Sequence, residues 1–214
     1  MTGWQDIRDG GRLLYDAAFF PPAEADTWLA WLRDNVPWRQ ESVQGRPLPR
    51  LNAWFSDADL RYSYSGVSHL GSGWTPELAE IKRRVEATAG VPFNSLLLNR
   101  YRDGGDSIGF HTDAERELGP DPVVATLSFG SEREFVLKHK RTKETLTYRL
   151  GHGSLLVMGG TSQHHWLHAV PKTELVVGER ISLTFRRISE AGQGPISAKP
   201  VAAADRGRDV GFAK

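Results

Sequence analysis

The sequence contains no cysteine, so disulfide bonds are excluded and any metal ion must be held by histidine and carboxylate side chains. It also lacks an apolar run near the roughly 18 residues that a membrane span needs, and residues 1–6 lack the basic-then-apolar order of a signal peptide. We therefore expect a cytoplasmic protein with no membrane partner. Excess charge is absent too: the net charge is +1, so composition alone does not indicate nucleic-acid binding.

What is present is the composition of a folded domain. With 214 residues, 39% of them hydrophobic and 25% charged, the chain fits one compact domain, expected to be monomeric. Two amphipathic helices are predicted, one from Pro22 to just before Pro37 and one that begins at Pro76, with Thr75 as its N-cap, and ends near Gly90. Helical spacing marks their buried residues, Ala25, Trp28, Leu29, Leu32 and Val36 in the first and Leu78, Ile81 and Val85 in the second.

From residue 93 the pattern changes to short runs rich in Leu, Val, Phe and Thr, separated by Gly, Asp and Pro. Such runs predict a mostly β fold with flanking helices, a sandwich or jelly roll (double-stranded β-helix). We expect helices and a recognition lid in 1–92, the jelly-roll core in 93–189 and a flexible tail without a catalytic role in 190–214. The expected strands are 95–101, 123–129, 134–138, 144–150, 154–158 and 180–187.

The triplet His111-Thr112-Asp113 is the first candidate for chemistry. On an extended backbone, residues two apart point to the same face, so both side chains can approach one metal ion. Two histidines and one carboxylate form the facial triad of non-haem iron(II) oxygenases. The triplet alone is weak evidence, because seven histidines among 26 acidic residues give roughly one His-x-Asp/Glu by chance.

A third ligand could come from the segment 163–168, which holds three histidines. If this segment is one strand, His165 points to the face opposite to His164 and His168. Spacing does not choose among the three.

The last expected strand, 180–186, has two unlike faces. Ile181, Leu183 and Phe185 share the apolar face, and Arg180, Ser182, Thr184 and Arg186 share the polar one. The polar face could lie in water, or it could form a pocket for a small dicarboxylate, because the planar fork of arginine fits a carboxylate. Asn99 and Tyr101, also two residues apart, could complete such a pocket.

Taken in order, Asn99-x-Tyr101, His111-x-Asp113, His168 and Arg180-x5-Arg186 resemble the AlkB family of Fe(II)/2-oxoglutarate-dependent nucleic-acid dealkylases. The resemblance covers about residues 40–188 and is strongest to the branch that repairs duplex DNA. It is carried by Leu98-Asn99-Arg100-Tyr101, by 111–118, by Ser128-Phe129-Gly130, by Gly153-Ser154-Leu155-Leu156 and by Leu183-Thr184-Phe185-Arg186.

The resemblance implies iron ligation by His111, Asp113 and His168. It also implies a 2-oxoglutarate site formed by Asn99, Tyr101, Arg180, Thr184 and Arg186, with Arg186 also in the catalytic set and O₂ as the second co-substrate. The implied activity is DNA dealkylation repair, in which N-methyl groups of 1-methyladenine and 3-methylcytosine are hydroxylated and leave as formaldehyde, with succinate and CO₂ as co-products. Ser182 departs from the family, which commonly has Asn between the two arginines.

For the substrate, the resemblance implies that Tyr64 stacks on the flipped base, that Tyr62 lines its pocket and that Glu115 reads its exocyclic amine. Val43-Gln44-Gly45 matches a hairpin whose tip fills the gap left by that base. Here the tip is Gln44, which stacks less well than an aromatic ring and leaves the choice between single- and double-stranded DNA open. Arg50 and the basic run 138–143 are interpreted as contacts to the backbone of methylated DNA, with RNA as the alternative partner.

The same residues are compatible with two other functions. One is an Fe(II)/2-oxoglutarate hydroxylase that acts on RNA, protein or a small molecule. The other is a non-catalytic nucleic-acid-binding jelly roll with a structural metal. The Tyr62/Tyr64 pair and the basic run favour DNA over a protein or a small molecule.

Overall fold

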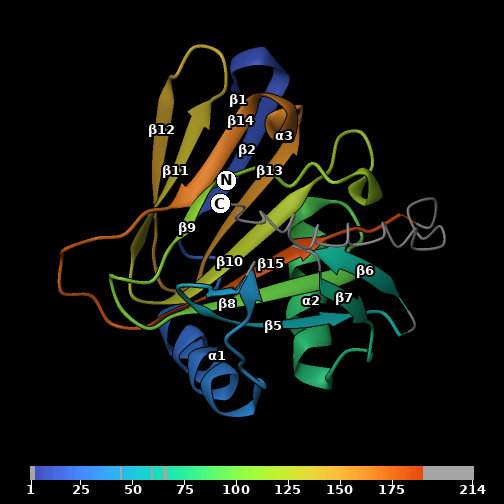
Figure 1. The fold of residues 1–214 in the computed structure, drawn as a ribbon, viewed down its shortest axis with the longest axis vertical. Helices are drawn as coiled ribbons and strands as arrows, with labels where there is room; N and C mark the ends of the chain where they lie inside the picture. Colours follow the sequence, from blue (N-terminus) through green and yellow to red (C-terminus); the bar gives the residue numbers. More distant parts are fainter. Residues whose placement is uncertain (1–2, 44, 59, 65–66, 190–214) are drawn as a thin grey trace, which may run out of the picture.

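The computed structural model describes residues 3–43, 45–58, 60–64 and 67–189, which form two facing antiparallel sheets with helices on one side (Figure 1). The larger sheet has the strand order β1-β2-β13-β10-β15-β8-β5, and the smaller one the order β12-β11-β14-β9. The larger sheet is built from β1 (Gln5–Ile7), β2 (Gly11–Asp16), β5 (Leu51–Ser56), β8 (Ser95–Tyr101), β10 (Val124–Gly130), β13 (Ser154–Gly160) and β15 (Arg180–Arg186). The smaller sheet is built from β9 (Ile108–His111), β11 (Arg133–His139), β12 (Thr145–Leu150) and β14 (Trp166–Val170). The expected jelly roll is confirmed.

Two hairpins stand apart from these sheets, β3 (Ser42–Val43) with β4 (Arg46–Pro47), and β6 (Arg61–Tyr64) with β7 (Val67–Leu70). Short helical turns occur at η1 (Arg8–Gly10), η2 (Arg116–Leu118) and α3 (Ser162–His165). In the part of the chain that the structure describes, no helix is long and apolar enough to cross a membrane.

Both predicted helices are present, as α1 (Pro22–Asn35) and α2 (Pro76–Ala89). The Thr75 side chain accepts a hydrogen bond from the Leu78 backbone N–H at 3.3 Å, and Gly90 ends α2 with φ +74°. Leu78, Ile81 and Val85 are fully buried, and each such side chain contributes about 1.5–3 kcal/mol by leaving water. The stripe belongs to the buried cluster between the helices and the larger sheet, and α1 and α2 lie together against the outer face of that sheet (Figure 1).

The inner face of the larger sheet packs on the smaller sheet. Tyr101 and Met158 from one sheet and Leu137 and Trp166 from the other belong to the same buried cluster. Strand β15 lies in the middle of the larger sheet, between β10 and β8, and all seven of its residues are buried. The option of an arginine face in water is therefore wrong, because both faces of a central strand are covered.

The N-terminal third holds the two expected helices, but it also forms strands that the expectation left out. It contributes β1, β2 and β5 to the larger sheet, where β2 pairs with β13 and β5 with β8. The expected boundary at residue 92 therefore does not separate the jelly-roll core from an extension. These strands escape sequence patterns because they are short and only partly buried, as in the Leu51–Ser56 strand. The expected tail, 190–214, lies outside the described residues.

Candidate active site

A cavity between the two sheets brings together most of the predicted site residues. His111 is at the end of β9, and His168 lies directly opposite it on the antiparallel neighbour β14. Asp113 follows two residues after His111, and one ligand atom from each of the three residues lies within 4.8 Å of the others. The structure thus assembles the predicted facial triad. The same cavity is lined by Asn99, Tyr101, Arg180, Ser182, Thr184 and Arg186.

The three histidines of segment 163–168 do not all lie on one strand. Residues 162–165 form the helical turn α3, and strand β14 begins only at Trp166. Strand alternation therefore does not apply to His164 and His165. His164 lies 3.0 Å from Asp121, while His168, on the strand itself, faces the cavity.

Hydrogen bonds set the tautomer of His111 in the form that a metal ligand needs. Its Nδ1 lies 2.8 Å from the Gly109 carbonyl oxygen, which can only accept a hydrogen bond. Nδ1 therefore carries the proton, and the lone pair of Nε2 is available for a metal ion.

A second cluster, Asp9, His139 and His165, also has the spacing of a metal site and borders a surface hollow of about 500 Å³. Its chemistry is different. The Thr142 backbone N–H donates to His139 Nδ1 at 3.0 Å, so the proton of the neutral ring is on Nε2, 3.0 Å from an Asp9 carboxylate oxygen. Arg141 also reaches this carboxylate, at 3.3 Å. This histidine and carboxylate therefore contact each other and are not suited to a metal ion.

The electrostatics of the triad favour a bound cation. Burial alone would raise the pKa of Asp113, but the Arg186 guanidinium, 2.8 Å away, and then His168 and His111 lower it to about 2. Burial, followed by His111, lowers the pKa of His168 to about 3. Burial also lowers the pKa of His111. At neutral pH the site therefore presents one carboxylate and two neutral imidazoles.

The side-chain atoms of the triad that are available as metal ligands suit iron(II). Asp113 Oδ2 is buried, has no hydrogen-bond partner within the described part of the chain, and lies 3.7 Å from His168 Nε2. Gln163 accepts a hydrogen bond from the Asp113 backbone N–H at 3.0 Å, and the Phe135 ring stacks on His168 with centroids 5.3 Å apart. Neither supporting residue was identified from the sequence, because nothing in the local pattern marks them.

Arg180 is a buried cation at the other end of the cavity. It is 1% exposed and donates to Ser128 Oγ at 2.8 Å, whereas its Nε and Nη1 have no hydrogen-bond partner among the described residues. Its guanidinium lies 5.2 Å from the centroid of the Tyr101 ring, and burial lowers its pKa. A buried guanidinium with unmatched donors fits a carboxylate ligand such as the distal end of 2-oxoglutarate.

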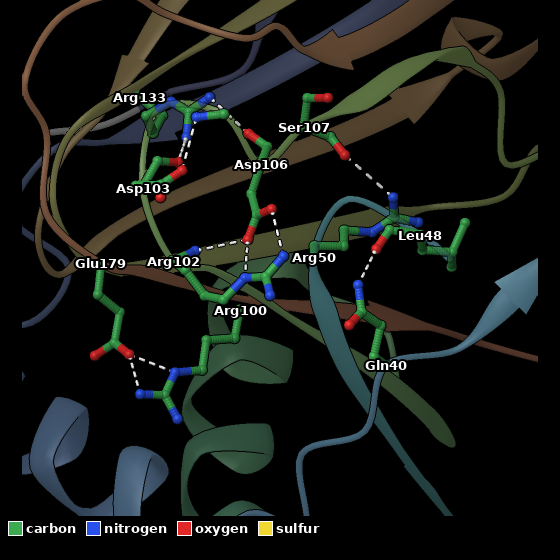
Figure 2. Close-up of polar contacts among 11 residues, drawn as sticks. Gln40, Leu48, Arg50, Arg100, Arg102, Asp103, Asp106, Ser107, Arg133 and Glu179 are labelled. Carbon is green, nitrogen blue, oxygen red and sulfur yellow. Dashed lines mark hydrogen bonds and ion pairs between the residues drawn. The ribbon is translucent and has the colours of Figure 1, made fainter. Parts of the chain in front are cut away.

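Arg50 is not where the DNA-contact interpretation requires it. The side chain is only 4% exposed and donates from Nε to Asn99 Oδ1 at 2.8 Å and from Nη1 to the Ser107 carbonyl oxygen at 3.1 Å. Figure 2 shows this arginine beside the loop that precedes β9. The predicted contact of Arg50 with a nucleic-acid backbone is therefore wrong, because its guanidinium is enclosed by protein.

The other substrate residues are only partly described. Glu115 is partly exposed, yet its Oε2 is buried and meets no hydrogen-bond partner in the described ranges, and burial raises the pKa of this carboxyl group. Tyr62 and Tyr64 lie on β6, which pairs with β7, but their side chains are outside the described residues. The β3–β4 hairpin is present, with Val43 paired to Arg46 and Gly45 at φ +75°, while its tip residue Gln44 is also outside the described residues.

Comparisons with known proteins agree with this geometry. Residues 12–186 match the family model described as the 2OG-Fe(II) oxygenase superfamily. The chain is 37% identical over 200 residues to the DNA oxidative demethylase ALKBH2 of Mus musculus, covering 86% of this chain and 84% of the relative. It is 42% identical over 180 residues to the alpha-ketoglutarate-dependent dioxygenase alkB homolog 3 of Rattus norvegicus, covering 77% of this chain and 60% of that relative. The solved structure of OsALKBH1 superimposes with a TM-score of 0.61 at 17% identity, covering 86% of this chain and all of that one, which supports the fold.

Fold, triad and family match together define an iron(II)- and 2-oxoglutarate-dependent dioxygenase, with Fe(II), 2-oxoglutarate and O₂ as its cofactor and co-substrates. Within that class, the chain belongs to the AlkB family of nucleic-acid dealkylases. The alternative of a non-catalytic jelly roll is thereby excluded.

Proposed function

We propose that this protein is a DNA repair enzyme that removes N-methyl groups from 1-methyladenine and 3-methylcytosine. The observation that carries the proposal is the single cavity that joins the His111–Asp113–His168 triad to the buried Arg180. The choice of DNA is supported by relatives named as DNA oxidative demethylases, which are similar over most of both chains.

In this proposal His111, Asp113 and His168 hold Fe(II), and Arg180 receives the distal carboxylate of 2-oxoglutarate. Asn99, Tyr101, Thr184 and Arg186 line the rest of the co-substrate pocket. When bound, iron, 2-oxoglutarate and O₂ hydroxylate the methyl carbon, and its release as formaldehyde accompanies succinate and CO₂.

The chain's own residues prepare this reaction. Arg186 keeps Asp113 ionised, and the Gln163 side chain fixes the Asp113 backbone. Phe135 covers one face of His168 and keeps water from it. The triad is therefore deprotonated and rigid before any ligand arrives, which reduces the reorganisation needed on binding.

We assign recognition of the methylated base to residues near the triad. The methyl group of both lesions is on the Watson–Crick edge, so the base must leave the stack to reach the triad. The buried Oε2 of Glu115, for which the described residues offer no partner, can accept a hydrogen bond from the exocyclic amine that both bases carry. We assign Tyr64 to stacking on the base opposite His111, and Tyr62 to the pocket wall.

Two elements are proposed to hold the nucleic-acid strand. The β3–β4 hairpin carries Gln44 at its tip, where it would fill the gap left by the base. The β11–β12 turn exposes Lys140, Arg141 and Lys143, and exposed cations of this kind bind phosphates without reading sequence.

The test uses oligonucleotides that carry one 1-methyladenine or 3-methylcytosine, prepared as single-stranded DNA, duplex DNA and RNA. Mass spectrometry follows loss of the methyl group after addition of Fe(II), 2-oxoglutarate and air. We expect demethylation of DNA and a large loss of that activity in Tyr64→Ala. Demethylation of RNA alone would reject DNA as the substrate, and succinate release without any demethylation would point to a protein or small-molecule hydroxylase.

A further inference from the structure

The buried Arg50 directly precedes β5, whose residue Asn52 pairs with Asn99 on β8. Its two described hydrogen bonds go to different places, the Asn99 side chain and the carbonyl of Ser107. The Ser107 backbone N–H in turn donates to the Pro49 carbonyl at 2.9 Å. Arg50 therefore links the segment after the β3–β4 hairpin to Asn99 in the cavity wall. It also links this segment to the loop before His111, where Figure 2 shows it near Ser107.

The bond to Asn99 determines which way its amide group faces. An arginine Nε–H can only donate, so the oxygen of the amide faces Arg50 and its Nδ2 group faces away. Among the described residues, Nδ2 has no hydrogen-bond partner, and Asn99 lines the same cavity as Arg180 and His111. The amide therefore offers donors, rather than a carbonyl oxygen, to whatever occupies the cavity.

We propose that Arg50 is a positioning residue for 2-oxoglutarate, because it holds the Asn99 amide with its NH₂ group toward the co-substrate. Carboxylate and keto oxygens accept hydrogen bonds, so the held orientation attracts 2-oxoglutarate and the flipped orientation repels it. Arg50 itself does not line the cavity and acts through Asn99. The inference rests on the proposed 2-oxoglutarate contact of Asn99 and does not depend on the nucleic-acid substrate.

The test is calorimetric titration of 2-oxoglutarate into the Mn(II)-loaded protein without oxygen. Arg50→Gln and Asn99→Ala are each expected to weaken 2-oxoglutarate binding about tenfold, equivalent to about 1.4 kcal/mol. The double variant is expected to bind no more weakly than Asn99→Ala, since both changes remove one interaction. The matched control is Arg39→Gln, which removes an exposed arginine that bridges the same β5 residue, Asn52, through its backbone only.

Two further measurements separate positioning from a merely structural role. In steady-state kinetics, Arg50→Gln should raise the KM for 2-oxoglutarate about tenfold and leave kcat at saturating 2-oxoglutarate within about twofold. Asn99→Asp should keep its contact with Arg50 as an ion pair, so the protein folds. It should bind 2-oxoglutarate more weakly than Asn99→Ala, because its carboxylate turns an acceptor oxygen and a negative charge toward the co-substrate.

Unchanged affinity in Arg50→Gln would overturn the proposal, as would losses in the double variant that multiply to about a hundredfold. If Arg50→Gln fails to fold, Asn99→Asp decides alone, and binding as tight as wild type would overturn the proposal. Because the calorimetric titrations use no DNA, absence of DNA demethylation together with intact coupling between Arg50 and Asn99 would reject the proposed function and leave this inference standing.

Discussion

Replacement of Arg180 by methionine should make the ligand-free protein as stable as wild type or more stable, while it removes selective binding of 2-oxoglutarate. Most substitutions of buried residues destabilise, so the sign of this effect is diagnostic. Arg180 is 1% exposed, and its Nε and Nη1 have no hydrogen-bond partner among the described residues. Methionine has a similar length and places no charge or donor in the pocket.

The magnitude follows from the contacts of the guanidinium. Each buried, unsatisfied donor costs about 1–3 kcal/mol, and two such groups disappear in the variant. Against this gain, the variant loses the bond to Ser128 and the contact with the Tyr101 ring, together about 2–4 kcal/mol. The gain is thus about 2–6 kcal/mol against that loss, and the middle of the two ranges leaves the ligand-free variant about 1 kcal/mol more stable than wild type. We expect its free energy of unfolding to lie between that of wild type and about 2 kcal/mol above it.

Ligand binding should change in the opposite direction. At a concentration one hundred times its Kd, 2-oxoglutarate adds about 2.7 kcal/mol to the stability of wild type. Loss of a buried charge partner costs at least about 2 kcal/mol of binding, which reduces this gain in the variant to about 1 kcal/mol or less.

Urea unfolding of the Mn(II)-loaded protein without oxygen measures both effects. The comparison ligand is 2-oxobutanoate, which has the keto acid but not the distal carboxylate. Wild type should be stabilised much more by 2-oxoglutarate than by 2-oxobutanoate, and Arg180→Met should respond equally to both. If the free energy of unfolding of the ligand-free variant fell by about 3–5 kcal/mol and the variant still preferred 2-oxoglutarate, Arg180 would not be the site of the distal carboxylate.

Three other predictions concern the triad, its pH dependence and the helix that supports the sheet. In metal-free protein, the folded-state pKa of His168 is about 3, below its unfolded value of about 6.5, so the unfolded state takes up the proton first and stability falls as the pH falls through about 6.5. Between pH 7 and pH 5, wild type should lose about 2 kcal/mol more than His168→Gln in urea unfolding, and parallel losses would contradict this. Gln163→Leu should leave the Asp113 backbone N–H unpaired and weaken Mn(II) binding about 10–100-fold in calorimetry, whereas unchanged affinity would show that this contact does not support the triad. Thr75→Ala should lower the free energy of unfolding by about 1 kcal/mol because α2 loses its cap, and an unchanged urea midpoint would show that the cap contributes nothing.

Local patterns predicted the parts of the fold that depend on local physics. The spacing of Leu78, Ile81 and Val85 and the caps at Thr75 and Gly90 identified α2. Alternation along 180–186 identified a strand with one apolar face, but not that both faces are covered, because this depends on the strand's central place between β10 and β8. Strands β2 and β5 were missed because each pairs with a strand far along the chain, β2 with β13 and β5 with β8, and such pairing leaves no local pattern.

The site shows the same division. His111 and Asp113 could be paired by spacing, whereas His168 was chosen by family resemblance and could not be chosen by alternation, since α3 interrupts the expected strand. Arg50 was interpreted as a surface cation. Its hydrogen bond to Asn99 joins residues far apart in the sequence, so no local pattern could indicate it. The Asp9–His139–His165 cluster has the composition of a metal site, and only the Thr142 hydrogen bond, which fixes the His139 tautomer, argues against one.

Oxidative DNA demethylation at the triad is tested most directly by two product yields, formaldehyde and succinate. Their ratio is measured with a 3-methylcytosine oligodeoxynucleotide for wild type and for Asp113→Ala. Oxidative demethylation forms the two products together, so wild type should release them in about equal amounts, with 2-oxoglutarate and air both required. Asp113→Ala removes the anionic ligand of the triad and should release neither. Formaldehyde release that persists in Asp113→Ala, or succinate release from wild type without formaldehyde, would contradict oxidative DNA demethylation at this triad.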